Sequence, residues 1–283
     1  MKAEKLPHHD RYPDLAKSYK AFFPFKLATT SFIYPADYIP NVVKLARFVD
    51  EIELLFFESA PADRLPDGAI IDQLARFSEE FKLSYNVHLP IDIDPACSDR
   101  TVRRQAVETI GRIIEACAAL VPTSYTLHVP MQAQDPDRQA LKRWETAVQS
   151  SISDLLAGGL DGKLLAVETL TYPFQWIEPT IEDFDLSVCI DFGHLALSGQ
   201  DLEDVFRRNF HRAAVIHLHG FDGNHDHLPL DRLDADLLEK ILTWIKPFSR
   251  TVSLEVFSYA DLMSSLNILE KTWKEVERIG AAF

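Results

Sequence analysis

Eight short apolar runs recur along the chain and constrain its fold more than any other feature. Each run is rich in β-branched or aromatic residues, and most are separated by segments with apolar residues at helical spacing. Alternation of this kind predicts a parallel sheet with right-handed crossovers, and eight repeats predict an α/β fold closed as a single-domain (β/α)8 TIM barrel. The predicted strands span residues 25–30, 52–57, 84–89, 125–129, 164–169, 187–190, 214–218 and 252–256.

The repeat between the fifth and sixth strands is the most irregular. Pro173 and Pro179 interrupt its helical pattern, which leaves room for only a short helix at about 176–184. Gly158 and Gly159 have the pattern of a helix end before the fifth strand. No flexible or charged linker divides the chain, so we expect one barrel over residues 25–283 with an N-terminal extension at 1–24.

Charge and cysteine usage narrow the class of protein. The 283 residues carry a formal net charge of −14, which argues against nucleic acid as a partner because duplex binding needs many lysines and arginines. Residues 1–24 lack the apolar core of a signal peptide, and no stretch is long enough to span a membrane. Cys97, Cys117 and Cys189 show no paired spacing, which predicts a reducing, cytoplasmic location. The oligomeric state stays open.

Polar side chains of three types fall at the ends of the predicted strands. Seven of the ten histidines lie there, and only His8, His9 and His211 lie elsewhere. Because the carboxyl ends of parallel barrel strands meet at one mouth, residues far apart in sequence are expected to become neighbours. The set comprises His88, His128, Glu168, Asp191, His194, His217, His219, His225, His227 and Glu255.

Imidazole and carboxylate together are typical ligands of zinc, manganese or iron. Because the set contains no cysteine, an open catalytic site is favoured over a closed structural zinc site. We therefore predict one to three divalent metal ions, zinc or manganese, in each chain. The main shell is predicted to consist of Glu168, Asp191, His217 and Glu255.

Further ions would need further ligands from the same set. His88 and His128 could complete a second position with Glu168 bridging, and His194 with His227 could build a third. His219 lies two residues from His217 on the same strand face, as a ligand, a substrate contact or a partner of a ligand. Glu53, on the second strand, is interpreted as an interior carboxylate that packs or supports a ligand.

Aromatic residues follow several of the same strand ends. They are predicted to form a pocket for a large, partly apolar ligand, although they could instead cap the core of the barrel. The candidates are Phe32, Tyr34, Tyr172, Trp176 and Phe257.

The polar motifs resemble those of the xylose isomerase-like barrels, which include sugar isomerases and epimerases and phosphodiesterases of the endonuclease IV type. The resemblance implies that the epimerase metal shell matches Glu168, Asp191, His217 and Glu255. It also implies that the additional nuclease ligands match His88, His128 and His194. The third nuclease metal uses an Asp-x-His pair, whereas residues 225–227 here read His-Asp-His, so a complete three-metal cluster stays open.

Three further segments resemble the cobamide-remodelling phosphodiesterase (CbiR) family. They read TTSFIYPAD at 29–37, IPNV at 39–42 and VHLP at 87–90. This resemblance implies hydrolysis of the phosphodiester in the nucleotide loop of adenosylated cobamides, which releases cobinamide phosphate and the lower-ligand nucleoside.

The leading hypothesis is therefore a metal-dependent phosphodiester hydrolase that acts on cobamides, with Glu168, Asp191 and Glu255 as the catalytic carboxylates. The first alternative is a sugar or keto-acid isomerase or epimerase, in which two carboxylates around one metal move a proton next to a carbonyl. The second is a barrel that binds a corrinoid without catalysis.

Overall fold

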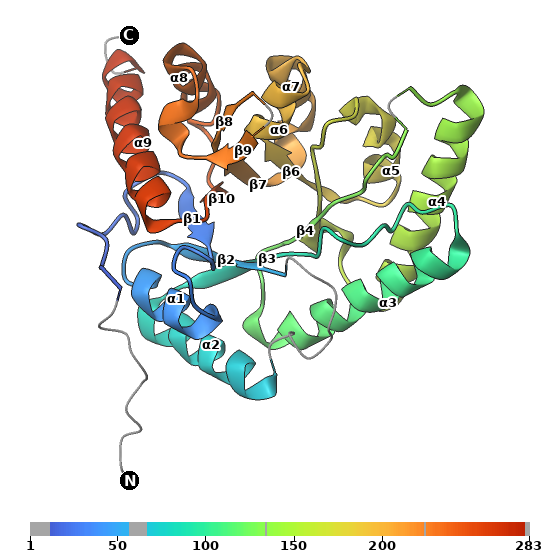
Figure 1. Cartoon of the computed structure of the whole chain (residues 1–283), viewed down its shortest axis with the longest axis horizontal. Helices are drawn as coiled ribbons and strands as arrows, with labels where there is room; N and C mark the ends of the chain where they lie inside the picture. Colours follow the sequence, from blue (N-terminus) through green and yellow to red (C-terminus); the bar gives the residue numbers. More distant parts are fainter. Residues whose placement is uncertain (1–11, 57–66, 134, 224, 281–283) are drawn as a thin grey trace.

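Eight parallel strands close into one barrel in the computed structural model, which describes residues 12–56, 67–133, 135–223 and 225–280 (Figure 1). The first strand pairs with both the second and the last, so the predicted (β/α)8 barrel is confirmed. The barrel strands are β1 (Lys26–Thr30), β2 (Glu51–Leu55), β3 (Ser84–His88), β4 (Tyr125–Leu127), β5 (Leu165–Glu168), β6 (Ser187–Asp191), β7 (Ala213–Leu218) and β10 (Thr251–Leu254).

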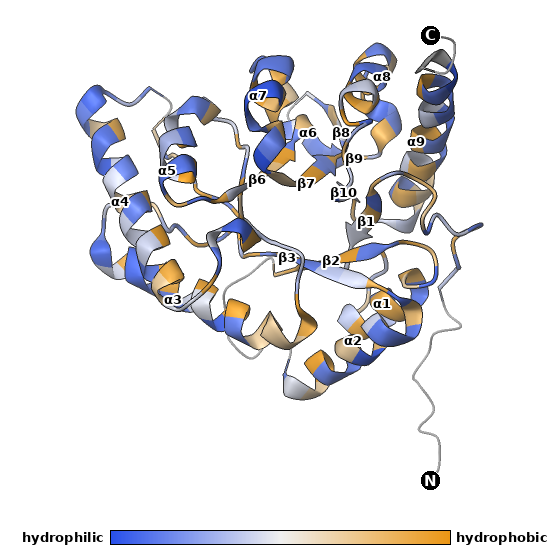
Figure 2. Ribbon diagram, turned by 180° about the vertical axis from the view of Figure 1, so that it is seen from behind, coloured by the Kyte–Doolittle hydropathy of each residue, from blue (hydrophilic) through white to orange (hydrophobic). Residues whose placement is uncertain are grey.

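Helices surround the barrel and turn their apolar sides toward the strands, as the hydropathy colouring in Figure 2 shows. Several begin at an aspartate whose carboxylate accepts a hydrogen bond from a first-turn backbone N–H, including Asp67, Asp99 and Asp137. The α-helices are α1 (Tyr38–Leu45), α2 (Gly68–Phe81), α3 (Arg100–Cys117), α4 (Arg138–Ala157), α5 (Glu178–Asp183), α6 (Phe192–Leu197), α7 (Leu202–Asn209), α8 (Ala235–Trp244) and α9 (Tyr259–Gly280). Short 3-10 turns are η3 (Ala118–Leu120), η4 (Gly162–Leu164), η5 (Phe174–Trp176), η6 (Phe210–Arg212) and η7 (Leu230–Arg232).

Most predicted boundaries agree with the structure to within two residues. The irregular repeat contains only η5 and the six-residue α5, as the two prolines predicted. Gly159 has φ +90° directly after α4, which explains a glycine at this helix end. The second strand begins at Glu51, one residue before the prediction, and the predicted strand residue Phe57 lies outside the described residues.

An antiparallel hairpin that the sequence analysis did not predict follows β7. It pairs β8 (Gly220–Asp222) with β9 (His225–Leu228). Its strands are only three and four residues long and lack apolar alternation, so the sequence pattern gives no strand signal there. The hairpin matters for function because it carries His227 back over the carboxyl end of β7.

The interior of the barrel is unusually polar. The main hydrophobic core lies between strands and helices, whereas a separate small cluster contains Ala166, Cys189, Ala214 and Val215. Large aliphatic side chains usually fill such interiors. Fully buried polar side chains occur here as well, among them Glu51, Glu53, Asn86, Thr126 and Ser253.

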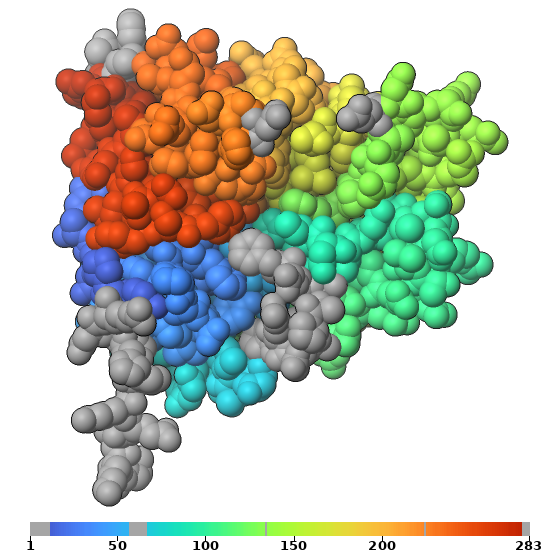
Figure 3. All heavy atoms as spheres, viewed as in Figure 1, coloured from blue at the N-terminus to red at the C-terminus, as the bar shows by residue number. Residues whose placement is uncertain are grey.

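The described part of the N-terminal extension, residues 12–24, packs on the outside of the barrel. Phe23 stacks on Phe25 and lies edge-on to Trp273 of α9, with ring centroids 4.9 and 5.7 Å away. Figure 3 shows this blue segment directly against the red C-terminal part of the chain. Residues 1–11 of the predicted extension lie outside the described residues. Within the described part of the chain, none of the helices has the length and apolar character needed to cross a bilayer.

Candidate metal centre

The carboxyl ends of β5, β6, β7 and β10 bring four predicted ligands together. Glu168 and Asp191 are the last residues of β5 and β6, His217 lies near the end of β7, and Glu255 follows β10 directly. One ligand atom from each of the four lies within 4.8 Å of the others, and all four side chains are buried. This set is the predicted main shell, and its chemistry suits a divalent cation.

A second group shares Glu168 with the first. His88 Nε2 lies 3.1 Å and His128 Nε2 lies 2.8 Å from the same oxygen, Oε2 of Glu168. His88 ends β3 and His128 follows β4, so this group extends the site across the neighbouring strands. Glu168 therefore belongs to both ligand groups.

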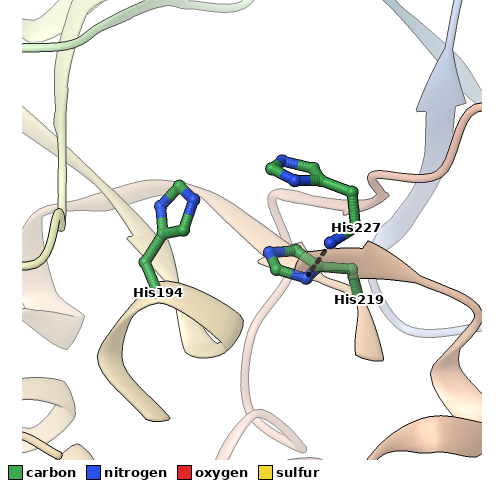
Figure 4. Close-up of side chains that lie close together, drawn as sticks. All are labelled: His194, His219 and His227. Atoms are coloured by element: carbon green, nitrogen blue, oxygen red, sulfur yellow. Dashed lines mark hydrogen bonds between the residues drawn. The ribbon is translucent and has the colours of Figure 1, made fainter. Parts of the chain in front are cut away.

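Three histidines form a third group, with His194 on α6, His219 after β7 and His227 on β9 (Figure 4). The rings of His219 and His227 are stacked with centroids 4.4 Å apart, and the backbone N–H of His227 donates to Nδ1 of His219. His219 Nε2 lies 3.1 Å from Oδ1 of Asp191, so Asp191 links the third group to the first. The sequence analysis left the role of His219 open, and the structure places it within this group.

The acid expected in the third group is displaced by one residue but still reaches it. Asp226 lies 3.0 Å from Nδ1 of His227 and 3.7 Å from Nε2 of His194. His225 is exposed and belongs to none of the ligand groups found among the described residues. The chain thus offers three histidines and an adjacent carboxylate at this position.

Four buried ligand atoms lack hydrogen-bond partners, and this is the strongest sign that the site fits a metal. His217 Nδ1 lies 2.9 Å from Oε2 of Glu255, and His194 Nδ1 lies 3.2 Å from Oε1 of Glu168, but none of these atoms is hydrogen-bonded. Unpaired buried polar atoms are costly, so their convergence calls for a partner outside the polypeptide. Cations bound within the ligand groups to which these residues belong would satisfy them.

The pKa values of the site residues also show that the buried carboxylates need positive charge beside them. Burial by itself lowers the pKa of His88, but the hydrogen bond and negative charge of Glu168 outweigh it and raise that pKa to about 9. Burial also opposes charge on His194, whose pKa nevertheless rises to about 12 beside Asp191. Burial raises the pKa of the Glu168 carboxyl, yet the surrounding histidines hold it well below its usual range. Protons on the histidines therefore supply the positive charge that this carboxylate cluster needs.

Neighbouring groups fix the orientation of the ligand rings. His217 Nε2 donates to Oε1 of Glu53 at 3.0 Å, and Ser253 Oγ donates to the other oxygen of Glu53 at 2.5 Å. This bond leaves Nδ1 of His217 as the ligand atom, which is how outer carboxylates support metal-bound histidines. Glu53 therefore occupies the supporting position considered from the sequence. His88 is fixed similarly, because its Nδ1 donates to the carbonyl of Leu89.

A glycine is required beside the third group. A Cβ atom on Gly193 would lie only 2.0 Å from Cε1 of His219, so no other residue fits there without moving the ring. The close approach explains the glycine in the Asp-Phe-Gly-His segment that ends β6 and opens α6.

Cys189 is a neighbour of the site that the sequence analysis missed. It precedes Asp191 by two residues on β6 and therefore faces the same side, and it groups with Glu168 and His217. Burial raises the pKa of its thiol well above the usual value. The strand alternation of Cys189 and Asp191 was the available signal.

A cavity of about 340 Å³ opens beside the metal-ligating groups. Its walls include His88, His128, His194 and Glu255, and its apolar side includes Phe257. Ile91 and Phe257 are 51% and 37% exposed at this cavity, which is unusual for large apolar side chains. The mouth therefore combines polar ligand groups with apolar surface.

The predicted aromatic pocket residues divide into two sets. Phe257 borders both the cavity and an adjacent groove, and Phe32 and Tyr34 line that groove. Tyr172 and Trp176 are not among the described residues lining either hollow. The buried Tyr172 ring instead packs on Trp176 and Trp144, which corresponds to the alternative that aromatic residues cap the core.

Known proteins share this architecture. A D-tagatose 3-epimerase-like protein is 18% identical with a TM-score of 0.74, covering 90% of this chain and 99% of that one. Endonuclease IV from Thermus thermophilus is 17% identical with a TM-score of 0.68, covering 88% and 99%. The IOLI protein, solved with a zinc atom, is 16% identical with a TM-score of 0.64, covering 89% and 96%. At these identities the likeness concerns the fold.

Comparison by sequence gives the family. No curated protein sequence matches the chain significantly. The family model described as "Xylose isomerase-like TIM barrel" matches residues 46–276, which is most of the chain. The chain therefore belongs to the xylose isomerase-like TIM barrel family.

Proposed function

We propose that the protein is a metal-dependent phosphodiester hydrolase. The observation that carries this proposal is the position of Glu168 between two ligand groups. Its Oε2 faces His88 and His128, while its Oε1 faces His194 and His217. A single-metal site needs only the four-residue main shell, whereas hydrolysis of a phosphodiester benefits from ions on both the attacking and the leaving oxygen.

The residues would divide the work according to their positions. One to three zinc or manganese ions, when bound, would polarise the phosphoryl oxygen and lower the pKa of a bound water. Glu168 would join two ion positions, and Asp191 would link the main shell to the histidine group through His219. Glu255 borders the cavity and would accept the proton of the attacking water.

The proposed substrate class is a cobamide, cleaved at the phosphodiester of its nucleotide loop. Support comes from apolar surface next to the ligand groups, where Ile91 and Phe257 face the cavity and Phe257 continues into the groove with Phe32 and Tyr34. A large macrocycle could cover this surface while its phosphodiester reaches Glu255. The acidic net charge is consistent with a substrate other than nucleic acid.

A second candidate is isomerisation or epimerisation of a sugar or keto-acid. It is favoured by the completeness of the main shell, in which Glu168 and Glu255 approach one position from β5 and from the end of β10. Two such carboxylates around one ion could move a proton between neighbouring carbons. In that case His88 and His128 would have no essential role.

His88→Ala and His128→Ala separate the two candidates, with His225→Ala as the matched control because His225 is exposed and outside the ligand groups. Metal content and turnover are measured on an adenosylated cobamide, on simple phosphodiesters and on ketose sugars. We expect cobamide cleavage in the parent and His225→Ala, and its loss with lower metal content in the other variants. Epimerisation that survives both substitutions would replace the hydrolase proposal. Tight cobamide binding without any product would instead indicate a non-catalytic corrinoid-binding barrel.

A further inference from the structure

The amino-terminal ends of the strands surround a second hollow, of about 540 Å³. Its walls come from residues at or just before the starts of β1, β4, β5, β6, β7 and β10. Because the ligand groups described above gather at the carboxyl ends, the two hollows lie at opposite ends of the barrel. The second hollow therefore has no part in the proposed hydrolysis.

Positive charge is concentrated in this hollow. Lys26, Lys163, Arg212 and Arg250 line it, together with a single carboxylate, Asp185. The chain as a whole carries 43 acidic against 29 basic residues, so four cations around one hollow run against its overall charge. A concave surface lined by one sign of charge concentrates its field and attracts counter-ions.

The two arginines are held in place and keep donors available. Arg250 donates from Nη1 to the carbonyl of Ala213 at 2.9 Å, and Arg212 donates from Nη1 to Oδ1 of Asp185 at 2.9 Å. Nε of Arg212 is buried and lacks a hydrogen-bond partner. A guanidinium has five N–H donors, so each arginine retains donors for a ligand after making these bonds.

The wall around these cations consists of small and hydroxyl side chains. Ala214 leaves space at the start of β7, and Thr123 and Thr251 line the hollow while donating to the buried carboxylate of Glu51. Lys26 also pairs with Glu51, with Nζ and Oε2 3.5 Å apart, so the buried carboxylate partly balances the charge of this lysine. Lys163 and Arg212 both pair with Asp185, at 3.4 and 2.9 Å, so this carboxylate balances part of their charge. Arg212, Arg250 and Lys163 together still outnumber it, which leaves the hollow with a net positive charge.

We propose that this hollow binds a phosphate monoester of sugar or nucleotide size. Arginine forks match phosphate oxygens in pairs, which favours phosphate over a single carboxylate. The volume lies within the range of small-molecule pockets and exceeds what an inorganic phosphate ion fills. The ligand would therefore insert its phosphate between the arginines and place its organic part over the wall that contains Ala214.

Calorimetric titration with ribose 5-phosphate, inorganic phosphate and ribose tests the proposal on the metal-loaded full chain. Lys163→Gln removes one cation whose side chain is 67% exposed and should leave folding intact. Arg212→Gln removes the arginine with the unused donor, and thermal unfolding checks that it folds. Arg104→Gln on α3 is the control, because that side chain is exposed and outside the hollow.

We expect ribose 5-phosphate to bind and ribose not to bind. Lys163→Gln should weaken binding about threefold and Arg212→Gln about tenfold, with no change in Arg104→Gln. Phosphate can also bind at the metal-ligating groups at the other end of the barrel. Weaker binding by the Lys163 and Arg212 variants would assign the ligand to this hollow. Equal affinity of all variants would overturn the proposal. Inorganic phosphate binding as tightly as ribose 5-phosphate would overturn the claim that an organic body is recognised.

Discussion

Two glutamates of the barrel interior, Glu51 and Glu168, are equally buried and differ in their partners. Glu51 lies at the amino-terminal end of β2 and receives hydrogen bonds from Ser84, Asn86 and Thr123. Thr251 and Lys26 complete its surroundings. Glu168 lies at the carboxyl end of β5 among histidines, and its Oε1 has no hydrogen-bond partner. Both side chains have no exposed surface.

The difference distinguishes a carboxylate that stabilises the fold from one that can bind a metal ion. The polypeptide itself satisfies Glu51, so nothing further is needed to bury its charge. Oε1 of Glu168 has no hydrogen-bond partner, and the charge of this carboxylate is balanced by protons on histidines, which a bound cation could replace. The same residue type at two ends of one barrel therefore predicts two distinct mutant phenotypes.

Glu168→Gln is the substitution with the largest expected effect. It keeps the shape but removes the charge that joins two ligand groups, so both turnover and metal content should fall. Because a metal supplies several kcal/mol of transition-state stabilisation, we expect a loss of about 1,000-fold in kcat. Kinetics on the proposed cobamide substrate and elemental analysis of bound metal provide the measurement. Glu182→Gln, exposed on α5, is the control, and a near-normal rate in Glu168→Gln would contradict the assignment.

Glu51→Ala should produce the opposite phenotype. Removal of this carboxylate leaves several donors at the base of the barrel unpaired, and we expect the free energy of unfolding to fall by about 3 kcal/mol. Metal content should not change, because Glu51 belongs to none of the ligand groups. Denaturant unfolding checks the result against Glu203→Ala, whose exposed ion pair with Arg207 should contribute little. A drop in metal content without a stability loss would erase the distinction between the two glutamates.

Glu53→Gln sharpens the comparison, because Glu53 lies on the same strand as Glu51 but contacts a ligand. An amide is a weaker acceptor for the N–H of His217, so that ring loses basicity and orientation. We expect metal affinity to fall by about 10-fold to 100-fold with a smaller effect on stability. Metal titration with a competing chelator measures it. An unchanged metal affinity would show that Glu53 only fills the interior.

Metal affinity and the stability of the metal-free protein should change with pH in opposite directions. The pKa values of His88 and His227 rise from 6.5 to about 9 beside the carboxylates. Their stabilising protons are fully present below pH 6.5 and are lost as pH rises through 9. Ligand binding requires deprotonated rings, and the deprotonated fraction of a ring with a pKa of about 9 rises about 50-fold between about pH 7 and 9. Metal affinity should therefore increase about 50-fold over this range while the metal-free protein loses stability. Affinity that stays constant over this range would argue against these histidines as ligands.

The fold was readable from the sequence because each strand is a short apolar run and most of the intervening segments have apolar residues at helical spacing. The exact helix starts at Asp67, Asp99 and Asp137 came from the structure. The hairpin β8–β9 was not readable, because its strands are short and polar and are stabilised by contacts with η7 and α6 rather than by their own pattern. Strand ends also depended on tertiary pairing, as the start of β2 at Glu51 shows.

Part of the candidate site could also be predicted from the sequence, because the positions of the strand ends follow from the fold. In a parallel barrel the direction of every strand is fixed, so residues at strand ends such as His88, Glu168 and Asp191 must converge. The bridge from His219 to Asp191 depends on ring positions that no spacing specifies. Tyr172 shows the limit most clearly, because an aromatic residue after a strand faces either the mouth or the surrounding core according to its neighbours.

Closure of the sheet between its first and last strands has a consequence for biosynthesis. Glu255 lies directly beyond β10, and β10 pairs with β1, so this ligand reaches its place only after all eight barrel strands have left the ribosome. Nascent chains that lack β10 hold the other three members of the shell without the fourth. We therefore expect the metal to bind after the barrel has closed and to stabilise the folded barrel, rather than to initiate the folding of an incomplete one.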